Sequence, residues 1–366
     1  MIPLYKVHTP TDIGNILAEV MISGQISAGP NNMKFEGLLA EYLGNPLVTT
    51  TGDISISLAM CLYMAGVRPD DEVIMSPLVC LATSCPVRNL FANIRWCDID
   101  PYTGNIDPED FKKKITKRTK AVMVYHWAGN PADLKEIYSI AHAHNIAVIE
   151  DAGEAFGADY EGKKIGNTGA DYTVFSFYPN RHITTIDGAA ITFTRKDEFE
   201  KACVLKRYGI NQQTFRSSNG EINPESDIPI AGWNNYMSHI AATLGVVQMK
   251  YANKIVSRQQ QNGLYFDEAL KDIPGITVLN KLVNSCSAYW VYTFLAEDRD
   301  YLLERLRQAG IYASKVHLRN DIYSCFTAGG ERLKGVDYFS GHYLSIPCGW
   351  WVSNEDRKYI VSVLNQ

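Results

Sequence analysis

The chain has 366 residues, of which 46% are hydrophobic and 20% are charged, and its formal net charge is -5. This balance excludes a disordered chain, a fibrous repeat and a coiled coil, and the length is typical of about two domains. The mild acidity, without a basic block, argues against nucleic acid and anionic membrane surfaces as partners. Eight scattered cysteines and no run of about 18 apolar residues lead us to expect a cytoplasmic protein with reduced thiols and no membrane span.

The N-terminal two thirds of the chain predict a mostly parallel α/β sheet. Residues 1–45 are expected to form an arm and a helix, and from about 45 to 195 short apolar runs alternate with amphipathic stretches. The expected strands are Leu47–Thr50, Glu72–Met75, Ile94–Cys97, Ala121–Tyr125, Ile146–Ile149, Tyr172–Phe177 and Ala190–Phe193. The expected helices are Ile54–Met64, Ala82–Phe91, Pro108–Lys114 and Pro131–His144, the last with a proline in its first turn.

The C-terminal third departs from this alternation. Its periodicity predicts one long helix from Met237 to Leu270, followed by a strand over Ala288–Leu295 and helices over Tyr301–Ala309 and Asn354–Leu364. We therefore expect an α/β fold with three parts: an arm and large domain over 1–235, a connecting helix over 236–274, and a small α+β domain over 275–366.

The first candidate binding loop follows the first expected strand. In open α/β sheets ligands bind beyond the carboxyl ends of the strands. Thr51, Gly52 and Asp53 stand there, directly before a helix. Small residues at this place can present backbone N–H groups and a helix N-terminus to a phosphate. The alternative is an ordinary turn in which Asp53 caps the helix.

Two further polar stretches follow strands at the same edge. Asp151 follows the apolar run Ile146–Ile149 and precedes small residues and Glu154, so a carboxylate there can hold a ring nitrogen protonated; a solvated loop acid is the alternative. Ser176 lies near the end of the strand expected over Tyr172–Phe177, where its hydroxyl can bond a phosphate. Arg181 and His182 follow in a polar loop and can face the same crevice. We expect no metal site.

These stretches, together with Gly24–Pro30, Phe35-Glu36, His126–Pro131 and Gly232-Trp233-Asn234, resemble the DegT/DnrJ/EryC1/StrS family of sugar aminotransferases. The resemblance covers essentially the whole chain. It implies the fold type I class, dependence on pyridoxal 5'-phosphate or pyridoxamine 5'-phosphate, glutamate as amino donor, and a nucleotide-linked keto-deoxy sugar as substrate. It also implies a homodimer with shared active sites. Glu154 and the region of Asn180 are similar to perosamine synthases, which favours a 4-keto-6-deoxy sugar.

The resemblance assigns a role to each matching residue. Asp151 matches the acid that pairs with the pyridine nitrogen of the cofactor, and Glu154 matches the residue beside its phenolic oxygen. The remaining matches concern the cofactor phosphate: the loop containing Gly52 and Asp53, the serine Ser176, and Asn234, which corresponds to an asparagine donated from the other subunit. Asp53 departs from the usual threonine, and its carboxylate must point away from a phosphate or weaken that site.

The most consequential departure is Arg181, which stands where the family has the lysine that bonds covalently to the cofactor. A guanidinium with a pKa above about 12 is neither a usable nucleophile nor a working base near neutral pH. We therefore expect normal transamination to be impaired, with the cofactor held non-covalently or as an external aldimine.

Three explanations of Arg181 stay open. It is an engineered change in an ordinary aminotransferase. Alternatively, the chain is similar to the family's pyridoxamine-phosphate-dependent sugar dehydratases and uses His182 as base, although His182 lies one position after the place of the family's lysine, which favours a supporting role for it. Or the chain is an inactive homologue with a binding or regulatory role.

Overall fold

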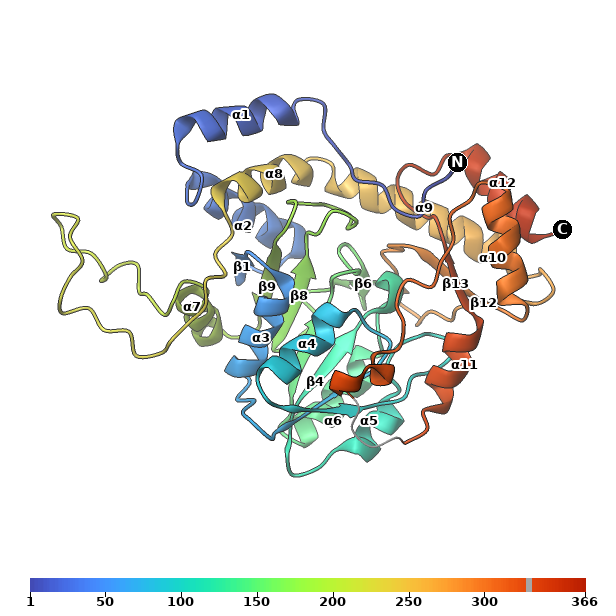
Figure 1. The fold of residues 1–366 in the computed structure, drawn as a ribbon, viewed down its shortest axis with the longest axis horizontal. Helices are drawn as coiled ribbons and strands as arrows, with labels where there is room; N and C mark the ends of the chain where they lie inside the picture. The colour runs from blue at the N-terminus through green and yellow to red at the C-terminus, as the bar shows by residue number, and fades with distance from the viewer. Residues whose placement is uncertain (327–330) are drawn as a thin grey trace.

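A seven-stranded sheet forms the centre of the computed structural model, which describes residues 1–326 and 331–366 (Figure 1). Its order is β1-β9-β8-β5-β4-β2-β3. The pairs among β8, β5, β4, β2 and β3 are parallel, whereas β9 pairs antiparallel with β8 and β1. The strands are β1 (Val48–Thr51), β2 (Glu72–Met75), β3 (Asn93–Trp96), β4 (Thr119–Tyr125), β5 (Ala147–Asp151), β8 (Tyr172–Ser176) and β9 (Ala189–Phe193). The predicted mostly parallel α/β fold is confirmed.

Helices cover both faces of this sheet, because alternate strand residues point to opposite sides. Val73 and Met75 of β2 join one buried cluster with α3 and α4, while Ile74 joins a second cluster with α2, α6 and α8. The helices of this part are α1 (Ile13–Ser23), α2 (Pro30–Leu43), α3 (Ile54–Met64), α4 (Leu81–Asn89), α5 (Pro108–Lys114), α6 (Leu134–Ala143), α7 (Lys196–Leu205) and α8 (His239–Met249).

The C-terminal part is built on a smaller antiparallel sheet of order β10-β12-β13. Its elements are α9 (Ala252–Leu270), β10 (Ile276–Val278), β11 (Ser285–Cys286), β12 (Tyr292–Ala296), α10 (Arg299–Gln308), α11 (Lys334–His342), β13 (Tyr343–Ile346) and α12 (Asn354–Leu364). Strand β11 pairs with β6 (Asp159–Tyr160), which pairs with β7 (Lys163–Lys164), so a third small sheet joins both parts. The domain boundaries at 235 and 275 remain predictions.

The predicted long helix from Met237 to Leu270 is wrong, because the structure has two helices there. At Lys250 and Tyr251 the backbone N–H groups bond to the carbonyls of Val247 and Gln248, three residues back. These tighter bonds end α8, and α9 starts at Ala252. The apolar periodicity continues across the turn, so it does not reveal the break.

Two other predicted elements start too early. Helix α6 begins at Leu134 and not at Pro131, because the carboxylate of Asp133 caps it by accepting from the N–H of Glu136. Strand β12 begins at Tyr292 and not at Ala288. The preceding residues instead bond across to the large part, with the N–H of Ala288 donating to Gly129 at 2.9 Å. No helix within the described ranges is long and apolar enough to cross a membrane.

Candidate functional site

The structure brings two predicted site residues and the start of α3 together at the carboxyl edge of the sheet. The surroundings of Gly153 show how close together these residues lie. A Cβ on this glycine would lie 3.1 Å from Oδ1 of Asp151, 3.4 Å from Cβ of Ser176 and 3.4 Å from Cδ1 of Ile54. The ends of β5 and β8 and the first residue of α3 therefore lie side by side, at the place where the sequence predicts a ligand crevice.

Asp151 is a buried carboxylate at the end of β5, with only 2% of its surface exposed. Its Oδ2 accepts from the hydroxyl of Thr83 at 2.6 Å, and its Oδ1 accepts from the N–H of Gly153 at 3.0 Å. Burial raises the pKa of Asp151 above its ordinary value, and these two hydrogen bonds partly oppose that rise. A carboxylate held in this way is suited to pair with a cationic N–H of a ligand.

Ser176, the last residue of β8, is buried and keeps its hydroxyl available. Its Oγ accepts a long hydrogen bond of 3.4 Å from the N–H of Tyr178. In the part of the chain that the structure describes, no acceptor is recorded for the Ser176 hydroxyl. This side chain can therefore donate to an anionic ligand in the crevice.

The loop of Gly52 and Asp53 is occupied by another residue of the same chain. The N–H of Gly52 donates to the carbonyl of Asn235 at 2.9 Å, and the N–H of Asp53 donates to Oδ1 of Asn235 at 2.8 Å. The Asp53 carboxylate accepts from the N–H of Ile56 at 2.8 Å and caps α3. A phosphate at these two amides would have to displace Asn235. The neighbouring Asn234 is exposed.

Arg181 places a permanent cation beside Glu154. Its Nη1 lies 3.4 Å from Oε1 of Glu154, and its guanidinium carbon lies 4.4 Å from the centroid of a Trp290 ring. Only 11% of the Arg181 side chain is exposed. Burial by itself lowers the pKa of Arg181, but the surrounding groups, with Glu154 the largest contributor among them, together outweigh burial and raise the pKa above its ordinary value.

Glu154 is an ionised carboxylate although it is 1% exposed. Its Oε1 accepts from Nε2 of His317 at 2.9 Å, and its Oε2 accepts from the N–H of Ala128 at 2.9 Å. Burial by itself raises the pKa of Glu154, but the hydrogen bond and charge of His317 and the charge of Arg181 hold it below its ordinary value. The burial of the Glu154 carboxylate is thus offset by two donors at the same oxygen, Arg181 and His317.

His317 and Trp290 are the parts of the site that sequence reasoning missed. His317 follows α10 in an irregular segment, and its Nε2 also lies 3.0 Å from the hydroxyl of Tyr125. Its ring is nearly parallel to that of Trp290, with an interplanar angle of 13°. His317 belongs to no periodic element or spaced motif, and the predicted strand Ala288–Leu295 that contains Trp290 gives no sign of a role in the site, so only the fold reveals them.

His182, in contrast, is turned away from Arg181 and Glu154 into the interior. Its Nε2 donates to the carbonyl of Ala288 at 2.9 Å, and its Nδ1 is buried with no recorded partner in the described residues. Burial lowers the pKa of His182 to about 4, and the nearby charge of Arg181 acts in the same direction. A buried, neutral imidazole tied to a backbone carbonyl is poorly placed to act as a base on a ligand, which disfavours the dehydratase alternative.

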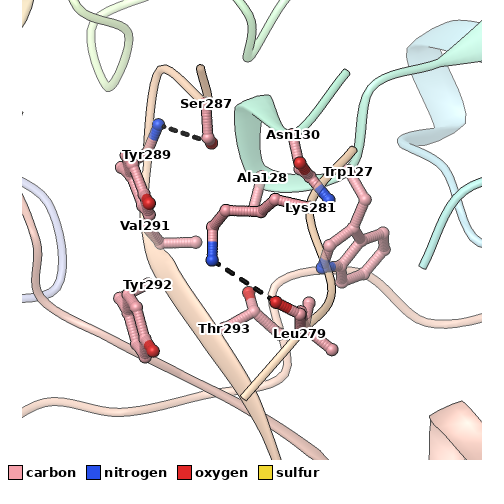
Figure 2. A pocket seen from close by; sticks show the side chains of 10 residues that line it. All are labelled: Trp127, Ala128, Asn130, Leu279, Lys281, Ser287, Tyr289, Val291, Tyr292 and Thr293. Atoms are coloured by element: carbon pink, nitrogen blue, oxygen red, sulfur yellow. Dashed lines mark hydrogen bonds between the residues drawn. The ribbon is translucent and has the colours of Figure 1, made fainter. Parts of the chain in front are cut away.

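Two other lysines do not supply the missing amine. The side chain of Lys281 lies in a pocket that is also lined by Ala128 (Figure 2). Its Nζ donates to the carbonyl of Leu279 at 3.3 Å and to Oδ1 of Asp267 at 2.6 Å. The side chain of Lys206 is buried against β1, and its Nζ lies 3.1 Å from Oε1 of Glu36 and 2.6 Å from the hydroxyl of Thr49. Both amines contact carboxylates within the chain, and among the described residues neither has a recorded contact with Asp151, Glu154 or Ser176.

Comparison with known proteins agrees with this architecture. The GDP-perosamine synthase of Caulobacter vibrioides is 31% identical, with the match covering 100% of this chain and 98% of the relative. The crystal structure of the sugar aminotransferase CalS13 from Micromonospora echinospora has a TM-score of 0.94 and 29% identity, covering 100% of this chain and 99% of that one. AtS13 from Actinomadura melliaura also has a TM-score of 0.94, with 30% identity, covering 100% and 98%.

The family itself follows from a match over nearly the whole chain. The sequence profile of the DegT/DnrJ/EryC1/StrS aminotransferase family matches residues 9–365 of this chain. This match includes the strand ends that carry Asp151 and Ser176 as well as the segment of His317. The chain belongs to the DegT/DnrJ/EryC1/StrS aminotransferase family.

Proposed function

We propose that this chain binds pyridoxal phosphate or pyridoxamine phosphate together with a nucleotide-linked keto-deoxy sugar, and that Arg181 blocks the ordinary transfer of an amino group from glutamate. The relatives named GDP-perosamine synthase favour a sugar of the 4-keto-6-deoxy type. The observation that carries the proposal is the position of Arg181, paired with Glu154 in the crevice that also contains Asp151.

The polar groups of the crevice fit a pyridoxal-type cofactor, which when bound supplies an electron sink for chemistry at an amine carbon. Asp151 is buried, ionisable and served by two donors, so it would hold a proton on the ring nitrogen. The Ser176 hydroxyl and the first N–H groups of α3, at Ile54 and Ser55, would hold the phosphate, because the N-terminus of a helix attracts anions.

The same crevice lacks the group that transfers protons in an aminotransferase. A lysine amine can be tuned to lose its proton near neutral pH, whereas a guanidinium keeps its proton. The neighbouring Glu154 raises the pKa of Arg181 further. Arg181 therefore neither bonds covalently to an aldehyde nor accepts a proton from a bound sugar.

A homodimer with shared sites forms part of the proposal. Asn234 lies near the end of the long segment between α7 and α8, which contains only isolated β-bridges and projects from the body of the chain (Figure 1). Apolar side chains on this segment are exposed, including Ile222 at 58% and Ile228 at 40%. A second copy of the chain would cover them and place Asn234 near the partner's cofactor phosphate. Size-exclusion chromatography with light scattering tests this arrangement.

The experiment that tests the function compares the unmodified protein with Arg181→Lys. Each is mixed with pyridoxal phosphate, and absorbance spectra are recorded before and after borohydride reduction of one sample and before and after addition of glutamate to a second, unreduced sample. We expect both proteins to bind the cofactor, but only Arg181→Lys to retain it covalently after reduction and to convert it to the amine with glutamate. Arg195→Lys, a change at an exposed arginine, is the matched control.

Each other outcome contradicts a stated part of the proposal. Turnover by the unmodified protein would show that Arg181 does not block the reaction. Loss of water from a keto sugar, abolished by His182→Ala, would establish the dehydratase alternative. Failure of both proteins to bind the cofactor would leave an inactive homologue with another binding role.

A further inference from the structure

One edge of the Arg181 guanidinium contacts Glu154, and the other edge has no recorded hydrogen-bond partner among the described residues. Its Nη1 faces Glu154 at 3.4 Å. Its Nε is buried without a partner, and among the described residues no hydrogen bond is recorded for Nη2. Nε and Nη2 form the side of the guanidinium that binds two oxygens of one anion, or one oxygen twice. A buried donor without an acceptor destabilises a folded protein unless a ligand satisfies it.

The orientation of this free edge is fixed before any ligand binds. Arg181 lies over Trp290, and the Nε1 of Trp290 donates to the carbonyl of Asn180 at 2.6 Å. Tyr5 of the N-terminal arm stacks on Trp290 with ring centroids 5.0 Å apart and an interplanar angle of 23°. The aromatic support and the Glu154 contact hold the planar group from two directions, which lowers the entropic cost of binding an anion.

The charges around the crevice suit a ligand that carries both signs. Glu154 would repel an anion, but Arg181 and His317 both approach its Oε1 and the N–H of Ala128 satisfies its Oε2. Asp151 has no cation within its hydrogen-bonded partners, which are Thr83 and Gly153. The unmet requirements are therefore a cationic N–H at Asp151 and an anionic oxygen at Arg181.

We propose that Arg181 is a ligand-binding residue: its Nε/Nη2 edge holds an anionic oxygen of the bound ligand, while Asp151 holds the protonated ring nitrogen. This inference rests on the proposed function, because it assigns Arg181 a role toward the same cofactor. The oxygen comes either from the phenolate of the pyridoxal-type ring or from the carboxylate of the amino acid that accompanies it. In the first case a charge-assisted hydrogen bond holds the cofactor where the family's lysine would bond to it covalently, and in the second case it holds the amino acid beside the cofactor.

The first experiment uses 4-deoxypyridoxine 5'-phosphate, which keeps the phenolic oxygen but has no aldehyde or amine with which to bond covalently. Its affinity and that of its 3-O-methyl derivative are measured by calorimetry for the unmodified protein, Arg181→Gln and Arg181→Lys. Methylation removes the anionic oxygen. For a phenolate at Arg181, we expect methylation to weaken binding to the unmodified protein by at least about 10-fold, and by less than about 3-fold in Arg181→Gln.

Arg181→Lys separates charge from geometry, since lysine keeps the positive charge without the planar fork. We expect this variant to show an intermediate effect of methylation. Arg195→Gln, on the exposed surface, should behave like the unmodified protein. Circular dichroism of each variant shows that a change in affinity does not arise from unfolding.

The second arm distinguishes the source of the oxygen. 2-Oxoglutarate is titrated into each protein saturated with 4-deoxypyridoxine 5'-phosphate. If the oxygen is a carboxylate, Arg181→Gln loses at least about 10-fold in affinity for 2-oxoglutarate while the effect of methylation is small in every protein. Equal binding by Arg181→Gln and the unmodified protein in both arms would overturn the inference and leave the proposed function intact. Absence of binding of the phosphate analogue to any of these proteins would overturn both.

Discussion

Nε2 of His317 lies 2.9 Å from Oε1 of Glu154, although 163 residues separate them in the chain. This contact joins a loop of the C-terminal part to the strand edge of the large part. It also explains how Glu154 stays ionised while almost fully buried, because the donor offsets the cost of removing a carboxylate from water. This pair therefore contributes to the stability of the site, together with the contacts of Glu154 to Arg181 and to the N–H of Ala128.

Replacing His317 by leucine should destabilise the protein at neutral pH by about 2 kcal/mol, because it leaves a buried carboxylate with fewer partners. The pKa of Glu154 is lowered in the folded protein, so its stabilising contribution exists above the ordinary value of 4.5 and is lost as the pH falls through the folded value. The difference in the free energy of unfolding between His317→Leu and the unmodified protein should therefore decrease as the pH falls below 4.5. Urea unfolding of both proteins across this pH range measures it.

The control for this prediction is the same substitution in a Glu154→Gln background. With the carboxylate removed, His317→Leu should cost less than about 1 kcal/mol, as expected for a neutral contact. His142→Leu, at an exposed histidine of α6, should have little effect at any pH. An equal loss with and without the carboxylate would show that His317 acts through packing alone.

His182 should make the protein less stable as the pH falls. Its pKa is about 4 in the folded state and 6.5 ordinarily, so between these values the unfolded chain binds the proton and the folded chain does not. The free energy of unfolding therefore decreases from pH 7 toward pH 4, by about 3 kcal/mol for this group.

His182→Gln tests that dependence. The glutamine amide can still donate to the carbonyl of Ala288 but cannot take up a proton, so the variant should show a flatter acid limb in urea unfolding curves. His144→Gln, at an exposed histidine, should keep the slope of the unmodified protein. An unchanged slope in His182→Gln would mean that His182 is not buried as a neutral imidazole.

The helices and strands predicted to the residue are those with strong local signals. Helices Ile54–Met64 and Asn354–Leu364 start after Asp53 and Ser353, whose side chains accept from the first-turn N–H groups. The break at Lys250 and the late start of β12 lack such signals. The second depends on backbone bonds from residues 288 and 290 to the distant 128–129 segment, which no local pattern contains.

The site divides in the same way. Asp151 and Ser176 could be found from sequence, because each ends an apolar strand and the ends of parallel strands share an edge. His317 and Trp290 could not, since each enters the crevice from an irregular segment of the C-terminal part. The orientation of His182 was also beyond sequence reasoning. Neighbours in a loop point in different directions, and only the carbonyl of Ala288 accounts for this one.

Asp151→Asn should weaken the binding of pyridoxamine phosphate by at least about 10-fold, because a neutral amide does not attract a protonated ring nitrogen. The same change should not destabilise the folded protein, since burial already raises the pKa of Asp151 and opposes its charge. Fluorescence titration and thermal unfolding measure the two effects.

Thr83→Val is the companion change, because it removes the hydroxyl that donates to Oδ2 of Asp151. It should raise the pKa of Asp151 further and shift the loss of cofactor affinity to higher pH. If Asp151→Asn binds the cofactor as well as the unmodified protein, the ring nitrogen does not lie at Asp151.

Substitutions of Asp53 test whether its carboxylate caps α3 or repels a cofactor phosphate. Its carboxylate accepts from the N–H of Ile56, so Asp53→Ala should destabilise the protein by about 1 kcal/mol, whereas Asp53→Asn keeps a capping oxygen and should cost only a few tenths. Neither change should alter the affinity for pyridoxamine phosphate by more than about 3-fold, because the capping carboxylate is directed at its own helix. Urea unfolding and fluorescence titration give the two numbers. A gain of about 10-fold in affinity on Asp53→Asn would instead place the carboxylate against the phosphate, since removing a like charge is the only part of that change which strengthens anion binding.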